Sequence, residues 1–73
     1  MNRTFTAIVE REGNGFVSLC PALNISSQGD TIEEAKSNLR EALELFFETA
    51  SASEIQTRVQ SEVYITQMEV AVG

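Results

Sequence analysis

The sequence contains no histidine and no tryptophan, and only one cysteine among its 73 residues. Because Cys20 has no second cysteine to pair with, an internal disulfide is excluded. A metal site built from histidines or from several thiolates is excluded for the same reason, and we expect no cofactor. A single free thiol is typical of a protein from a reducing compartment.

Long hydrophobic runs are also missing. Residues 1–12 contain no apolar stretch of the kind that forms the centre of a signal peptide. Nowhere does the chain reach the ~20 consecutive apolar residues that cross a bilayer as a helix. The sequence therefore predicts a cytoplasmic protein.

Positive charge is scarce, with five Lys and Arg against eleven Asp and Glu, for a net charge of −6. Such a field repels a polyphosphate backbone, so direct nucleic-acid binding is not expected. It attracts a basic partner, such as a protein that itself handles RNA. The length allows a single domain, residues 1–73, with no separate DNA-binding domain.

The first half of the chain shows the alternation of β-strands. Apolar residues alternate over 5–10, and residues 16–20 are again rich in β-formers. The intervening Glu12-Gly13-Asn14-Gly15 favours a turn, which predicts a hairpin. Pro21 ends the second strand, and residues 24–28 form a third, short one.

A helix is predicted from Thr31 to about Thr49. Thr31 followed three residues later by Glu34 matches a capping box. Apolar residues then recur every three or four positions and form one stripe that faces a sheet: Ile32, Ala35, Leu39, Ala42, Leu43, Phe46 and Ala50. Residues 54–60 fit either a short helical turn or a loop.

Alternation returns over residues 62–72, which predicts a long final strand. The fold class is thus α+β, a single β-β-β-α-β domain with one mainly antiparallel sheet and one amphipathic helix packed on it. The final strand has apolar residues on both faces, more than one helix covers. Either it lies inside the sheet with something on its second face, or it pairs with another copy of the chain.

An ordered set of short motifs resembles the HicB antitoxin family. It covers Gly15-Phe16-Val17, Cys20-Pro21-Ala22-Leu23, Gln28-Gly29-Asp30-Thr31, Glu34-Ala35, Leu39 and Glu41-Ala42. The resemblance implies a degraded ribonuclease-H-like core and a HicA-like toxin as partner, a small RNA-cleaving protein whose active site the antitoxin covers. Many HicB proteins add a C-terminal DNA-binding module, and nothing basic follows the last predicted strand here.

Five apolar residues are candidates for partner binding: Leu45, Phe47, Tyr64, Ile65 and Met68. Leu45 and Phe47 lie off the main helical stripe, so they either pack under residues 51–60 or form a toxin-binding or self-association surface. The three on the last strand pose the same choice between core and interface. We expect no catalytic residues, because helical carboxylates normally serve solubility and ion pairing.

The sequence thus predicts a non-enzymatic, antitoxin-like module that binds a HicA-like toxin and forms a homodimer or higher homo-oligomer. Two alternatives stay open at this point. One is a stand-alone oligomeric regulatory or structural protein without a toxin. The other is a small metal-dependent hydrolase that uses the acidic residues.

Overall fold

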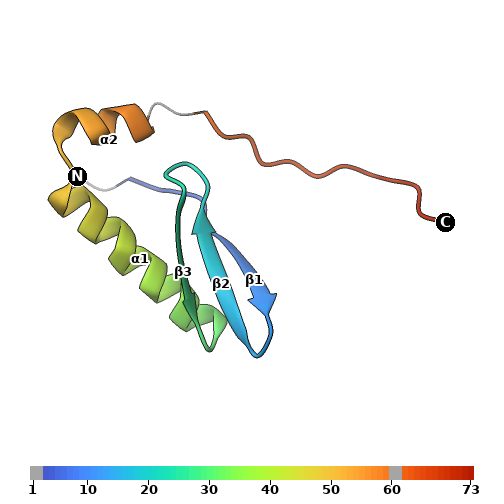
Figure 1. Ribbon diagram of the computed structural model, residues 1–73. Helices are drawn as coiled ribbons and strands as arrows, with labels where there is room; N and C mark the ends of the chain where they lie inside the picture. Colours follow the sequence, from blue (N-terminus) through green and yellow to red (C-terminus); the bar gives the residue numbers. More distant parts are fainter. Residues whose placement is uncertain (1–2, 60–61) are drawn as a thin grey trace.

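The computed structural model describes residues 3–59 and 62–73. Its elements follow in the order β1 (Ile8–Glu12), β2 (Gly15–Cys20), β3 (Ile25–Gly29), α1 (Ile32–Thr49) and α2 (Ala52–Val59). Figure 1 shows α1 beside the sheet, α2 at one end of α1, and residues 62–73 running away from both. The predicted α+β class is confirmed, with one antiparallel sheet packed against a helix.

The sheet has three strands in the order β1-β2-β3, and both pairs are antiparallel. Glu12 pairs with Gly15, so Gly13 and Asn14 form the hairpin loop, and Gly13 has a φ of +59°. The first strand was predicted over 5–10 but begins at Ile8. The residues before it lead toward α1, where the Phe5 ring packs on Phe47.

The predicted start and end of α1 are confirmed. The Thr31 hydroxyl accepts a hydrogen bond from the Glu34 backbone N–H at 3.0 Å. The Glu34 carboxylate accepts in turn from the Asp30 N–H at 3.3 Å, one residue before the cap. The first bond satisfies a backbone donor that the first turn of a helix leaves unpaired, and the second ties the residue before the cap to the same turn.

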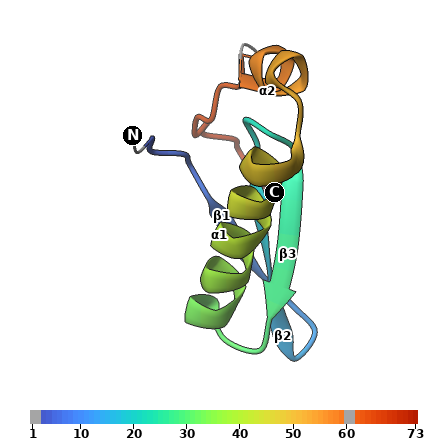
Figure 2. The ribbon, with the colours of Figure 1, turned by 90° about the vertical axis from the view of Figure 1, so that its left-hand side faces the viewer.

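The core lies between α1 and the helix-facing side of β2 and β3 (Figure 2). Its fully buried apolar side chains are Cys20, Leu23, Ala35 and Leu39. Cys20 is thus a free thiol that packs as a small buried residue of the core. Ile32 was expected in the core stripe but is 50% exposed, because it is the first residue of α1 and lies at the rim of the packed region.

A close approach of backbones holds α1 against the sheet. A Cβ placed on Gly29 would lie 2.5 Å from the Ala35 backbone nitrogen, so only glycine fits at the end of β3. Nearby, the Asn38 side-chain amide donates to the Gln28 carbonyl at 2.7 Å. The chain therefore turns from β3 into α1 without a gap between the two elements.

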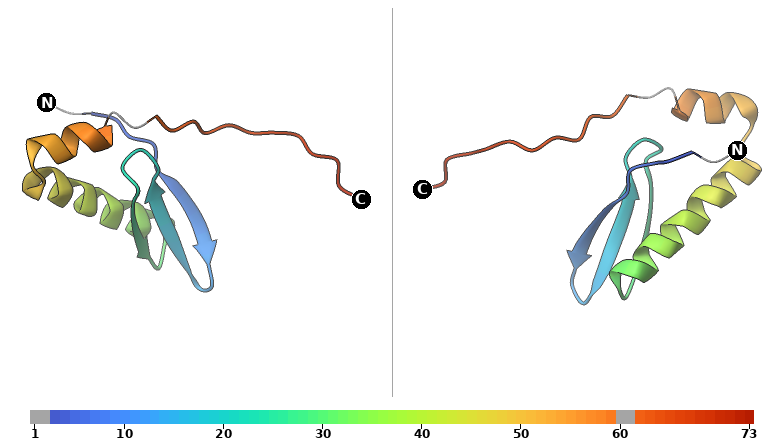
Figure 3. Two further views of the ribbon diagram at one scale, coloured as in Figure 1. Left: turned by 45° about the horizontal axis from the view of Figure 1, so that its top comes forward. Right: turned by 180° about the vertical axis from the view of Figure 1, so that it is seen from behind.

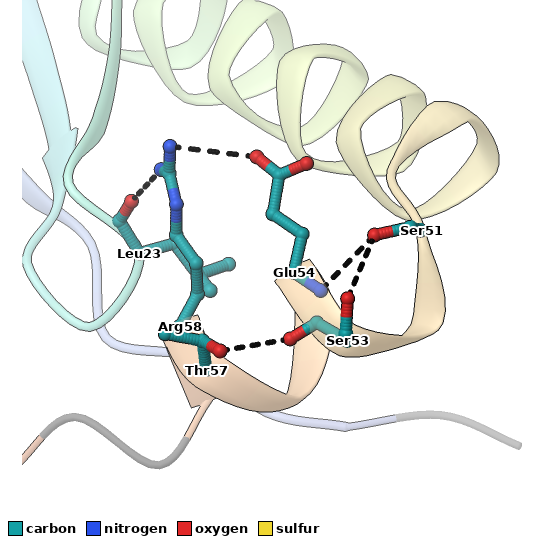
Figure 4. Close-up of polar contacts among 6 residues, drawn as sticks. All are labelled: Leu23, Ser51, Ser53, Glu54, Thr57 and Arg58. Atoms are coloured by element: carbon teal, nitrogen blue, oxygen red, sulfur yellow. Dashed lines mark hydrogen bonds and ion pairs between the residues drawn. The ribbon is translucent and has the colours of Figure 1, made fainter.

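The residues after α1, which the sequence assigned either to a short helical turn or to a loop, form the short helix α2. The Ser51 hydroxyl accepts from the Glu54 N–H at 3.2 Å and caps α2, while Arg58 donates to the Leu23 carbonyl at 2.7 Å (Figure 4). The Arg58 guanidinium also lies 5.3 Å from the centre of the Phe46 ring. These contacts attach α2 to the loop between β2 and β3 and to α1. Gln60, the last residue of that segment, lies outside the described residues.

The predicted final strand is wrong for the single chain. Residues 62–73 contain no strand, are exposed along their whole length and extend away from the sheet (Figures 1 and 3). An alternating sequence makes a segment suitable for a sheet, but a strand forms only where a neighbouring strand pairs with its backbone. We call residues 62–73 the C-terminal arm. None of the helices in the described parts of the chain is long and apolar enough to cross a membrane.

Candidate protein-binding surfaces

The structure does not bring the five candidate residues together. Leu45 and Phe47 are two positions apart on α1, and at ~100° per residue they lie on nearly opposite sides of the helix. Tyr64, Ile65 and Met68 are on the C-terminal arm. The candidates therefore fall into three separate surfaces.

Leu45 lies on the outer face of α1, and 58% of it is exposed. Glu41 and Glu48 are exposed one turn before and one turn after it, on the same side of the helix. Glu34 continues this line toward the start of α1. We call Glu34, Glu41, Leu45 and Glu48 the acidic strip. It places one exposed apolar side chain among three carboxylates, an arrangement that suits contact with a basic protein surface.

Phe47 is half-buried and belongs to the packing of the domain. Its ring stacks on Phe5 at 5.7 Å between centroids and meets Phe46 edge-on at 5.2 Å. Of the two alternatives left open by the sequence, packing holds for Phe47, although its stacked partner is the N-terminal segment. Sequence reasoning did not find Phe5 in this role, because no local pattern shows that residues before β1 bend toward α1.

An open pocket of about 760 Å³ lies on the β1 side of α1. Its apolar wall includes Phe5 and Ala7 from the segment before β1, and Leu39, Leu43 and Phe47 from α1. We call this hollow the β1-side pocket. Its rim carries charges of both signs: Arg3, Lys36, Arg40, Glu44 and Glu48.

The C-terminal arm exposes most of its apolar surface. Tyr64 is 83% and Met68 82% exposed, and Ile65 is exposed as well. Val70 and Val72, which were not among the candidates, are exposed too. The Tyr64 hydroxyl donates to the Glu62 carboxylate at 3.0 Å, a contact within the arm itself. So large an apolar segment in water is typical of a surface that binds another chain.

The carboxylates are spread over the surface. Within residues 3–59 and 62–73, no three residues of the types His, Cys, Asp and Glu lie close enough to hold a metal ion. Lys36, Arg40 and five glutamates are all exposed on α1. Their arrangement supports electrostatic recognition of a charged partner.

Comparison with known proteins shows the family to which the chain belongs. No family model and no solved structure matches the chain. A UPF0150 protein of Helicobacter pylori is 33% identical over 66 residues, which cover 89% of this chain and 92% of the relative. Two UPF0150 proteins of Synechocystis are 44% and 42% identical over 50 residues, or 63% and 69% of their lengths. The chain belongs to the UPF0150 family.

Proposed function

We propose that this protein is an antitoxin-type binding module whose partner is a small, basic, RNA-cleaving protein of the HicA kind. The resemblance of residues 15–42 to HicB supports this assignment, and so does the net charge of −6. A chain of this charge binds a basic protein faster than a neutral chain does, because opposite fields steer the encounter.

The acidic strip is the observation that carries the proposal. Leu45 is a large apolar side chain that the fold leaves in water on the solvent face of its main helix. Its neighbours Glu41 and Glu48 place negative charge on both sides of it. Surface helices usually keep that face polar, so an exposed leucine between carboxylates suits a contact with a basic partner.

Neutralisation needs no chemistry from this chain. A standard interface buries ~800 Å² on each partner, and one long helix with its flanks supplies an area of that order. A toxin that cleaves RNA uses a basic surface to hold the phosphates. An acidic module seated on that surface excludes the RNA by occupying the same charges.

The test begins with a search beside this gene for one that encodes a small basic protein, whose product is co-expressed with this chain and analysed by size-exclusion chromatography. RNA cleavage by the neighbour is then measured with and without this chain. We expect the two proteins to elute together and cleavage to stop. We also expect the affinity to fall when the salt concentration rises from about 0.1 M to about 1 M, because the Debye length falls from ~10 Å to ~3 Å and the ion pairs are screened.

Reversal of one charge within the acidic strip tests whether binding depends on this surface or only on the net charge of the chain. Glu41→Lys should weaken the complex, whereas Glu12→Lys, which changes the net charge equally at the exposed hairpin, should leave it nearly intact. Equal effects of the two variants would show that the strip is not the binding surface. Failure of the wild-type chain to bind or inhibit its neighbour would favour the stand-alone oligomeric protein instead.

A further inference from the structure

The sheet ends at β1, and α1 does not cover that end. In the described residues β1 pairs only with β2, so its outer edge has free backbone N–H and C=O groups. The main contacts of α1 are with β3 and β2, and it barely reaches β1. Exposed strand edges of this kind pair readily with an added strand.

The flank of α1 that extends past β2 is apolar. Leu39, Leu43 and Phe47 recur along it at helical spacing and form a wall of the β1-side pocket. The pocket lies between this flank and the segment that leads into β1. The fold therefore has both an unpaired edge and an unfilled apolar space at the same side of the sheet.

The C-terminal arm has the properties of the missing strand. Its residues alternate, with Tyr64, Thr66, Met68, Val70 and Val72 on one side and without a charge among them. At about 3.3 Å per residue an extended segment of this length spans on the order of 35 Å, more than the five residues of β1 require.

We propose that the C-terminal arm pairs as a β-strand with the β1 edge of a second copy of this chain and covers its β1-side pocket. In the structure the arm runs away from its own sheet, as Figures 1 and 3 show from three sides. Each copy has one arm and one uncovered β1 edge, so two copies related by a twofold axis satisfy both. This inference does not depend on the proposed toxin.

Leu45 and Glu41 of the acidic strip lie outside the covered pocket, whereas Glu48 lies at its rim. Leu45 lies on the side of α1 opposite Phe47, which contributes to the pocket. Arm exchange therefore covers one flank of α1, while partner binding through Leu45 and Glu41 uses another. Loss of one does not require loss of the other, so the two proposals fail separately.

The experiment uses the full chain. Sedimentation equilibrium should give at least twice the 8.0 kDa mass of one chain. A mixture of isotope-labelled and unlabelled chains should then show contacts between the methyl groups of Met68, Val70 or Val72 and the rings of Phe5 or Phe47. Isotope filtering retains only contacts between different chains, so the arm must come from the other copy.

A proline substitution in the C-terminal arm tests whether the arm pairs as a strand. Val70→Pro removes a backbone donor from the added strand without touching the packed domain, and it should raise the dissociation constant at least tenfold. Val70→Thr keeps the β-preference and should remain associated. A monomeric wild-type chain, arm contacts found only within one chain, or an oligomer indifferent to Val70→Pro would each overturn the proposal.

Discussion

The Ser18 hydroxyl on β2 donates a hydrogen bond of 2.8 Å to the Ala35 carbonyl of α1, and both residues are buried. This bond joins sheet and helix at the centre of the core. A buried hydroxyl requires such a partner, because an unpaired one costs about 1–3 kcal/mol. Ser18 therefore fixes where α1 sits along the sheet, in addition to filling space.

Removal of this hydroxyl should destabilise the domain moderately. Ser18→Ala should lower the free energy of unfolding by about 1 kcal/mol, since the bond is lost but the Ala35 carbonyl can keep its helical partner. Ser18→Val should cost more, because a larger side chain meets a packed core. Urea denaturation at one fixed protein concentration measures both. Ser26→Ala, at an exposed position of β3, is the control and should change stability little.

Substitution of Gly29 should have a larger effect. A Cβ at this position would lie 2.5 Å from the Ala35 nitrogen and 2.8 Å from the Glu34 carbonyl carbon, and backbone atoms cannot move aside as a flexible side chain does. Gly29→Ala should therefore cost about 3 kcal/mol. Gly13→Ala meets no atom within 4 Å and should cost only about 1 kcal/mol for its positive φ. Equal losses in thermal unfolding would contradict this ranking.

Replacement of Arg58 should lower the local stability of α2 and not that of the rest of the domain. Its bond to the Leu23 carbonyl and its position over the Phe46 ring are the polar attachments of that helix to the domain. Arg58→Ala should speed amide hydrogen exchange in Ala52–Val59 about tenfold and leave the exchange of β2 and α1 unchanged. Gln56→Ala, exposed on the same helix, should not alter the rate. Faster exchange throughout the domain would show that α2 unfolds only with the rest.

Truncation of Leu45 should affect binding and not folding. Its side chain is mostly exposed, so Leu45→Ala should change stability by less than about 0.5 kcal/mol. If the acidic strip binds the basic neighbour, affinity measured by calorimetry should fall about tenfold, as for an apolar contact inside an interface. Ile32→Ala truncates an equally exposed apolar residue on another side of α1 and should leave affinity unchanged. Equal losses for both variants would argue against the strip.

Local signals predicted the elements whose structure is decided locally. The hairpin follows from the turn residues between two alternating segments, and α1 follows from Thr31, Glu34 and a periodic stripe. The end of α1 at Thr49 was predicted as well. The position of Ile32 was not, because periodicity says which side a residue faces and not whether the sheet extends that far.

The local sequence of the C-terminal arm does not determine where the arm lies. Its alternation predicts a strand, but whether a neighbouring strand pairs with it depends on distant parts of the chain or on another chain. The same limit applies to the candidate residues, because their contacts depend on parts of the chain that are distant in sequence. Tyr64, Ile65 and Met68 are exposed, as an interface requires, whereas the stack of Phe47 on Phe5 depends on the path of residues before β1.

An unpaired arm also bears on how long the protein survives in a cell. Proteases bind their substrates as extended chains, and residues 62–73 are extended and exposed without any change in the domain. A copy whose arm is covered by another chain offers no such entry point. Turnover of this protein should therefore depend on its concentration, with dilute chains trimmed first and associated chains persisting.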